Sequence, residues 1–289
     1  MALPHDPLWP RAHTLFNSEF SGHSDVTLVG VPASQTSLSP TSAHETPKAI
    51  RSALLRYSTA HADQRVSLER LALRDAGDAT SPDDNEESAI EQLMKLKAET
   101  HLLVALGGDN SITYSGVKGT GATGLITLDA HYDLRDGISN GSPVRRLIDT
   151  GLDGRKVVQI GIADFSNSTE YAKRAKDFGI TVIARSSLRS RPISDIWAEA
   201  TSIAGEKVFV DFDMDVCDRS VVPACPAAAP GGISADEIRQ FAFLAGRSKS
   251  IIGADITEID STKDSSDERT VRLAALVVLE MIAGLSTRE

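Results

Sequence analysis

Short runs of aliphatic and β-branched residues alternate along this chain with longer segments in which apolar residues recur every three or four positions. The short runs predict eight strands, at residues 25–32, 71–75, 101–106, 124–130, 156–162, 180–184, 207–213 and 251–256. The longer segments predict six helices, at residues 47–58, 86–100, 170–178, 194–204, 234–246 and 270–285. Strands and helices that alternate in this way are typical of βαβ units and a parallel sheet.

Most of the predicted strands are too apolar to have a solvated face, as expected for strands that helices cover on both sides. We therefore expect a single doubly wound α/β domain over residues 1–289, because no repeat or interdomain linker divides the sequence. Pro47 marks one helix start, and Ser234 followed by Glu237 predicts a capping box at another. The polar runs 80–88 and 260–267 are expected to be surface loops.

Composition narrows the class of protein. The 289 residues are 41% hydrophobic, enough for a substantial core, and 30 basic against 40 acidic side chains give a formal charge of −10. This charge argues against nucleic acid or an anionic membrane surface as the partner. The chain has two cysteines, no apolar stretch long enough to span a bilayer and no leader-like N-terminal segment, so we expect a cytoplasmic protein without disulfides or membrane anchor.

Polar residues gather where three of the predicted strands end. The segments are Gly-Gly-Asp-Asn-Ser at 107–111, Asp-Ala-His-Tyr-Asp at 129–133 and Asp-Phe-Asp-Met-Asp at 211–215. In open α/β sheets, ligands bind outside the carboxyl ends of the strands. These three segments are therefore the candidate functional site.

The second and third segments carry the chemistry of a hard metal ion. Side chains alternate along a strand, so Asp129, His131 and Asp133 are expected on one side, and so are Asp211, Asp213 and Asp215. Crowded carboxylates either take up protons or bind cations, and carboxylates with one imidazole favour Mn²⁺ over Zn²⁺. Four of these carboxylates balance two dications, which would acidify a shared water into a hydroxide nucleophile.

Less specific interpretations exist for each residue. A single Asp at a strand end is more often a helix cap or a turn former than a ligand. Two acidic clusters on one side of separate strands are harder to explain structurally, because burying unpaired carboxylates is costly. A dinuclear metallophosphoesterase would need further histidine ligands, and no histidine follows His131.

The two acidic segments resemble motifs of the ureohydrolase family, which contains arginases, agmatinases and formimidoylglutamases, and the resemblance extends over nearly the whole chain. It implies a three-layer α/β/α arginase-like fold with a mainly parallel sheet of about eight strands, and two Mn²⁺ per subunit. By this resemblance Asp129 and Asp213 bridge both ions, His131 and Asp215 complete one site, and Asp133 helps to complete the other. Asp211 falls where the family usually has a small polar residue, so it is not among the predicted ligands. Glu258 falls on the acidic residue that holds the substrate's cationic group.

The first segment departs from the family pattern. Its Gly-Gly-Asp is followed by Asn110, where the family usually has a metal-binding His. An amide oxygen is a weaker ligand than imidazole, so the ion beside Asp133 is expected to bind loosely. Formimidoylglutamases include a similar replacement. The same residue keeps open the alternative of a catalytically silent family member.

The segment after the second motif points to the substrate. The stretch 139–146 resembles the Ser-Gly-Thr-Pro-Phe-Arg segment of formimidoylglutamases and lacks the proton-shuttling His of arginases. This resemblance makes Asn140, Ser142, Arg145 and Arg146 candidate substrate-binding residues, with both arginines suited to a dicarboxylate.

The implied reaction is Mn²⁺-dependent hydrolysis of N-formimidoyl-L-glutamate to L-glutamate and formamide, a step of histidine degradation. A metal-bridging hydroxide would attack the amidine carbon, Glu258 would orient the amidinium and Asp133 would relay the proton. The alternative is a guanidino-acid hydrolase or agmatinase that releases urea. The family commonly forms trimers or hexamers, so we also expect a homo-oligomer.

Overall fold

The computed structural model describes residues 6–20, 22–63 and 66–288. Within these ranges nine strands form one sheet in the order β1-β3-β2-β4-β9-β8-β5-β6-β7, and each neighbouring pair is parallel. The strands are β1 (Phe16–Asn17), β2 (Ser24–Val31), β3 (Leu73–Asp78), β4 (Thr100–Gly107), β5 (Gly124–Leu128), β6 (Val157–Ile162), β7 (Thr181–Ala184), β8 (Val208–Asp213) and β9 (Ile251–Thr257).

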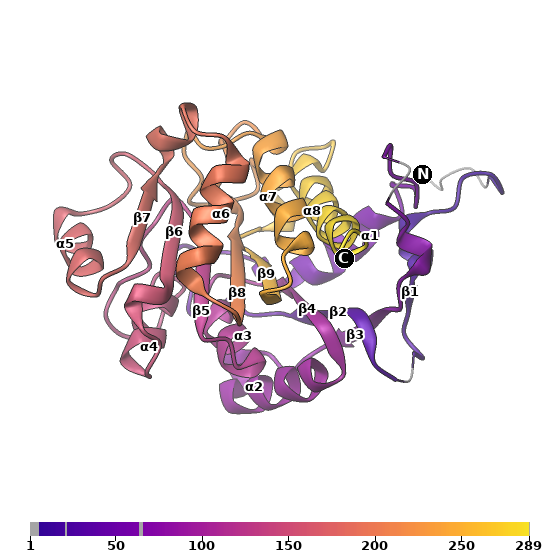
Figure 1. Ribbon diagram of the computed structural model, residues 1–289, viewed down its shortest axis with the longest axis horizontal. Helices are drawn as coiled ribbons and strands as arrows, with labels where there is room; N and C mark the ends of the chain where they lie inside the picture. The colour runs from indigo at the N-terminus through magenta and orange to yellow at the C-terminus, as the bar shows by residue number, and fades with distance from the viewer. Residues whose placement is uncertain (1–5, 21, 64–65, 289) are drawn as a thin grey trace.

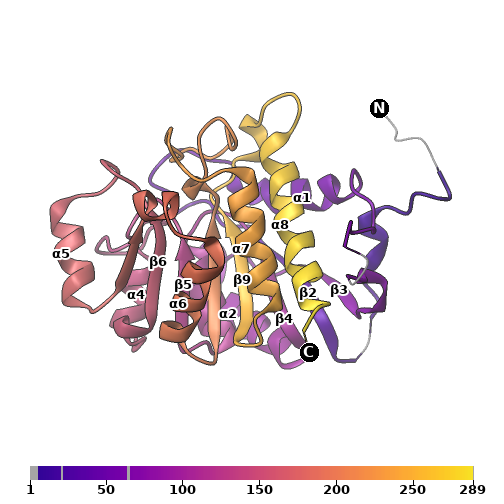
Figure 2. The ribbon, with the colours of Figure 1, turned by 45° about the horizontal axis from the view of Figure 1, so that its top comes forward.

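Helices cover both faces of this sheet (Figures 1 and 2). They are α1 (Thr46–Leu54), α2 (Pro82–Ala98), α3 (Ile112–Thr120), α4 (Pro143–Asp149), α5 (Thr169–Asp177), α6 (Ile193–Ala204), α7 (Ala235–Arg247) and α8 (Arg269–Leu285). One face packs against α1, α6, α7 and α8, and the opposite face packs against α2, α3, α4 and α5. The expected three-layer α/β/α architecture is therefore confirmed.

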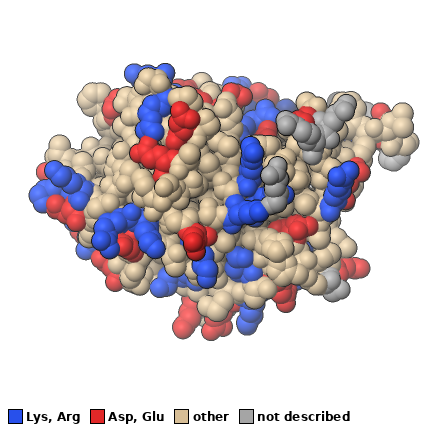
Figure 3. Space-filling view, viewed as in Figure 1, with Lys and Arg blue, Asp and Glu red and all other residues tan. Residues whose placement is uncertain are grey.

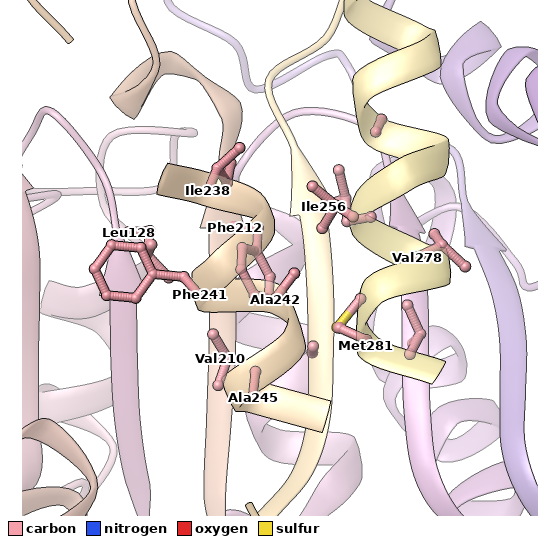
Figure 4. Packing of buried hydrophobic residues seen from close by; sticks show 14 of the residues in the cluster. Leu128, Val210, Phe212, Ile238, Phe241, Ala242, Ala245, Ile256, Val278 and Met281 are labelled. Atoms are coloured by element: carbon pink, nitrogen blue, oxygen red, sulfur yellow. The ribbon is translucent and has the colours of Figure 1, made fainter. Parts of the chain in front are cut away.

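The largest part of the hydrophobic core lies under α7 and α8 (Figure 4). Phe241 and Ala242 of α7 and Met281 of α8 are fully buried in one cluster with Phe212 of β8 and Ile256 of β9. Completely burying an aliphatic or aromatic side chain contributes roughly 1.5–3 kcal/mol to folding. This cluster fixes the two central strands that carry part of the polar site at their carboxyl ends.

The eight predicted strands and six predicted helices are all present, with ends that shift by up to four residues. Three elements were not predicted: the two-residue strand β1, which makes the sheet nine-stranded, and the helices α3 and α4. The predicted loop at 80–88 is wrong, because α2 begins at Pro82. The side chain of Ser81 caps this helix by accepting a hydrogen bond from the Asp83 N–H, and Asp83 and Asp84 lie in its first turn.

Basic and acidic side chains are interspersed on the face shown in Figure 3, where Lys and Arg lie close to Asp and Glu. Among the residues that the structure describes, no helix is long and apolar enough to cross a membrane.

Candidate metal centre

The candidate site lies at the carboxyl ends of four strands that are adjacent in the sheet, β4, β9, β8 and β5. Asn110 follows β4, Glu258 follows β9, Asp213 ends β8 and Asp129 follows β5. The strands are parallel, so the four chain segments leave the sheet at the same edge. Residues that are up to 148 positions apart in the sequence thereby come into hydrogen-bonding contact.

Five of the predicted ligands form two overlapping groups. Asp129, His131 and Asp215 form one, and Asp129, Asp133 and Asp213 form the other; within each group one ligand atom per residue lies within 4.8 Å of the others. Of the two predicted bridging residues, Asp129 belongs to both groups and Asp213 to one.

The prediction that strand alternation would place these side chains on one side was wrong for the residues that follow the strands. Strand β5 ends at Leu128, and β8 ends at Asp213 and continues into the 3₁₀ turn η6 (Met214–Val216). Strand alternation therefore does not orient the later side chains. The backbone of Asp133 has a φ of 53°, a left-handed conformation that is uncommon outside glycine and that turns the chain at this point.

Backbone N–H groups hold the carboxylates in place. Asp129 Oδ1 accepts a hydrogen bond of 2.6 Å from the His131 N–H, and Asp213 Oδ1 accepts one of 2.9 Å from the Asp215 N–H. Asp215 Oδ1 accepts from Ala130 N, and its Oδ2 lies 2.9 Å from His131 Nδ1. Asp129 Oδ2 is buried and has no hydrogen-bond partner among the described residues, which leaves this oxygen for a cation.

The electrostatics of the cluster also favour a cation. Burial, followed by the charge of Asp215, raises the pKa of Asp129 to about 6, and burial and neighbouring carboxylates raise the pKa values of Asp133 and Asp213 well above their usual range. Burial lowers the pKa of His131, but Asp215 and Asp129 outweigh this effect and raise it to about 12. The carboxylates are unstable as anions unless positive charge lies among them, and metal ions provide it.

Asn110 and Glu258 complete the rim of the cluster. Asn110 is buried, its Nδ2 donates to Asp133 Oδ2 over 2.6 Å, and its N–H donates to Glu258 Oε1 over 2.8 Å. Glu258 also accepts from Asn140 Nδ2 over 2.9 Å. Burial raises the pKa of Glu258 to about 8. A nearby cationic group would stabilise the ionised form of this carboxyl.

A second pair of buried carboxyls lies beneath the site. Asp211 of β8 and Asp255 of β9 are register partners on neighbouring strands, and both are fully buried. Burial and the charge of Asp255 raise the pKa of Asp211 well above its usual range, and burial raises the pKa of Asp255 to about 7. Asp211 belongs to neither ligand group, in agreement with its exclusion from the predicted ligands.

A cavity of about 320 Å³ opens at this cluster of predicted ligands. It is lined by His131, Asp133, Asp213, Asp215 and Glu258 at its base, and by Leu38, Arg135, Asn140, Asn167 and Tyr171, among others, on its walls. The structure brings the predicted substrate residue Asn140 to this cavity. Ser142 does not line it, because its hydroxyl bonds both the N–H and the C=O of Ser139 and closes a turn.

The structure does not bring the two predicted arginines to the cavity either. Arg146 makes two hydrogen bonds to Glu86, of 2.8 and 2.7 Å, and its guanidinium lies 3.8 Å from the centre of the Tyr114 ring. Arg145 pairs with Asp149 over 2.8 Å.

Arg135 lines the cavity instead, and this residue was not among the predicted site residues. Its guanidinium has no ion pair with any other described side chain. The signal in the sequence was its place two residues after Asp133, inside the segment that follows the second motif.

The chain is similar to known proteins in sequence and in fold. The family model for the arginase family matches residues 24–284. A formimidoylglutamase from Halalkalibacterium halodurans is 37% identical over 89% of this chain and 86% of that protein. The crystal structure of formimidoylglutamase from Bacillus subtilis subsp. subtilis strain 168 superposes with a TM-score of 0.92 at 30% identity, over 99% of this chain and 95% of that one.

Trypanosoma cruzi formiminoglutamase with Mn²⁺ has the same fold, with a TM-score of 0.89 at 24% identity over 97% of this chain and 100% of that one. These comparisons agree with the resemblance inferred from the motifs. The chain belongs to the arginase family.

Proposed function

We propose that this protein hydrolyses N-formimidoyl-L-glutamate to L-glutamate and formamide with two Mn²⁺ ions. The observation that carries the proposal is the pair of overlapping ligand groups around Asp129 at the base of a cavity that Glu258 also lines. The identity to formimidoylglutamases, 37% and 33% for two bacterial proteins, supports this substrate over others of the family.

The donor set fits two hard divalent ions. Asp129 would contact both ions, His131 and Asp215 would hold one, and Asp133, Asp213 and Asn110 would hold the other. By the family resemblance, Asp213 would also reach the first ion. Carboxylate oxygens with one imidazole suit Mn²⁺ by ligand type. Bound here, the ions would supply a water of lowered pKa as the nucleophile.

The protein's own side chains would then position the substrate and move protons. Glu258 is fixed by hydrogen bonds from Asn110 and Asn140, so its carboxylate is held ready to pair with the cationic amidinium. Asp133 lines the cavity, and burial raises its pKa well above the usual range, which suits a group that receives a proton and passes it to the departing amine nitrogen.

The carboxylates of the substrate need a cation, and Arg135 is the basic residue that supplies it in this proposal. It lines the cavity, whereas the acidic partners of Arg145 and Arg146 already neutralise those two side chains. A guanidinium can bind a carboxylate through two parallel hydrogen bonds.

A product assay with several substrates tests the proposal. Purified protein in excess Mn²⁺ would be given formimidoylglutamate, arginine, agmatine and guanidinobutyrate in parallel, and formamide, glutamate and urea would be measured. We expect formamide and glutamate from the first compound and no urea from the others. Faster release of urea from agmatine or guanidinobutyrate would assign the alternative activity, and two bound ions without any turnover would assign a silent family member.

The proposal also includes the setting of the reaction. We place it in the degradation of histidine, in the cytoplasm, and in a trimer or hexamer of this chain. Cys217 and Cys225 are free, buried thiols, which suits a reducing compartment. Light scattering of the purified protein would measure the oligomeric mass.

A further inference from the structure

The side chain of Asn110 has two possible orientations at the metal cluster. Turning its amide about the Cβ–Cγ bond exchanges Oδ1 and Nδ2 and leaves all contact distances nearly unchanged. With Nδ2 toward Asp133 the residue donates to a carboxylate, and with Oδ1 toward Asp133 it presents a lone pair to a cation. Only the second orientation makes Asn110 a metal ligand, so something in the structure must select it.

The opposite end of the amide contacts two threonine hydroxyls. In the structure, which holds no metal ion, Asn110 Oδ1 is on this side: it lies 2.6 Å from Thr113 Oγ1 of α3 and 3.4 Å from Thr257 Oγ1 of β9. Each hydroxyl also contacts a buried carboxyl, Thr113 over 2.9 Å to Asp255 and Thr257 over 3.4 Å to Asp211. All five side chains are buried, so these contacts are not shared with bulk water.

Counting donors and acceptors decides between the orientations. A hydroxyl has one hydrogen to donate. Burial keeps a proton on the neighbouring carboxyls of Asp211 and Asp255, and with that proton between the two, the oxygens that face the threonines, Asp255 Oδ2 and Asp211 Oδ1, have only acceptor sites. If Thr113 donates its hydrogen to Asp255, its oxygen can only accept on the side of Asn110. The amide must then offer an N–H hydrogen there, and the same reasoning applies to Thr257 with Asp211.

We infer that Thr113 and Thr257, each held by a buried carboxyl, accept the two amide hydrogens of Asn110 and so direct its Oδ1 toward the metal cluster. Thr113 and Thr257 are thus positioning residues for a metal ligand, with Asp255 and Asp211 setting the direction of their hydroxyl groups. The inference rests on the proposed role of Asn110 as a ligand of the ion beside Asp133.

Mn²⁺ binding to the substrate-free protein tests this inference without any dependence on the substrate. The affinity of each ion would be measured by calorimetry and by the free-Mn²⁺ electron paramagnetic resonance signal. Thr113→Val is expected to weaken one of the two binding steps by roughly 10-fold or more, the range found when outer partners of metal ligands are removed. Thr113→Ser, which keeps the hydroxyl, is expected to restore it.

Thr120→Val is the matched control. Thr120 lies on the same helix, is nearly buried and bonds only backbone carbonyls of that helix, so its loss should leave both binding steps unchanged. Thr257→Val gives a second variant with a smaller expected effect, because its contacts are longer. Circular dichroism melting would compare the folded state of all variants.

The decisive comparison uses Asn110→Ala as background. If Thr113 acts through the amide, Thr113→Val should add no further loss of Mn²⁺ affinity once the amide is absent. Wild-type binding of both ions by Thr113→Val and Thr257→Val would overturn the inference, and so would an equal loss in the two backgrounds. Failure of hydrolysis with normal Mn²⁺ binding would instead count against the proposed function alone.

Discussion

Replacing Arg135 by alanine tests which arginine binds the carboxylates of the substrate. The structure favours Arg135, whereas the sequence favours Arg145. Arg135 lines the cavity and is unpaired among the described residues, while Arg145 lies outside the cavity lining and pairs with Asp149 over 2.8 Å. Arg135→Ala and Arg145→Ala each remove one guanidinium. If Arg135 binds the substrate, only Arg135→Ala should impair substrate binding; if Arg145 binds it, only Arg145→Ala should.

The expected size of the effect follows from the kind of contact. A hydrogen bond to a charged group contributes roughly 1.5–3 kcal/mol, and each 1.4 kcal/mol changes an equilibrium tenfold, so Arg135→Ala should lower kcat/KM about 10- to 100-fold. The substrate carboxylates do not change during the reaction, so the loss should appear mainly as a higher KM. Arg145→Ala breaks a partly exposed ion pair worth at most about 1 kcal/mol of stability, and its KM should stay within about twofold of the parent.

Steady-state hydrolysis of formimidoylglutamate in saturating Mn²⁺ measures both variants. Melting temperatures would show whether either change acts through the fold, and Arg135 is exposed, so its removal should alter stability little. A large rise in KM for Arg145→Ala together with an unchanged KM for Arg135→Ala would refute the reasoning. The arginine at 145 would then have to leave Asp149 when substrate binds.

Three further outcomes are expected. Asp129→Asn should lower the content of both ions and abolish activity, since Asp129 belongs to both ligand groups, whereas Asp153→Asn, at a partly exposed position outside both groups, should do neither; elemental analysis after dialysis measures this. Asn110→His should tighten binding of the ion beside Asp133, and an unchanged affinity in a Mn²⁺ titration would contradict the weak-ligand argument. Burial raises the pKa values of Asp129 to about 6 and Glu258 to about 8, so the chelated folded protein binds more protons than the unfolded chain between about pH 4 and 8. Its melting temperature should therefore fall as pH rises through this window, and saturating Mn²⁺ should suppress the fall.

The strands could be predicted because their amino-acid composition directly reflects how deeply they are buried. Both faces of the central strands are covered by helices, so nearly every position is apolar. The sequence of helix α3 contains no comparable signal. It contains Gly116 and Gly119, which are poor helix formers, and a Cβ on either would come within 2.6 Å of Phe209 or Leu93. This helix forms because it packs closely against residues that are distant in the sequence, so local helix propensity does not predict it.

The same distinction explains the candidate site. Five of the six predicted metal ligands lie in two short contiguous motifs, so their spacing is visible in the sequence. Which arginine is available for substrate depends on partners far along the chain. Arg146 pairs with Glu86, which lies 60 positions away, and no spacing rule near Arg146 indicates this pair. A motif can predict that an arginine lies near the site. Whether its guanidinium is free to bind substrate depends on the side chains that pack around it in the folded protein.

Two departures from the family pattern, at positions 110 and 211, meet in one hydrogen-bond network. An imidazole that binds a metal through one nitrogen has a single N–H to satisfy, and one acceptor is enough to orient it. An amide that binds through oxygen has two N–H hydrogens, and it needs two acceptors behind it. The hydroxyl oxygen of Thr113, which also contacts Asp255, supplies the first acceptor. The hydroxyl oxygen of Thr257, which also contacts Asp211, supplies the second. A carboxyl at 211 is therefore the expected companion of an amide at 110, and its burial in the sheet, costly by itself, has a physical reason in the orientation of the ligand.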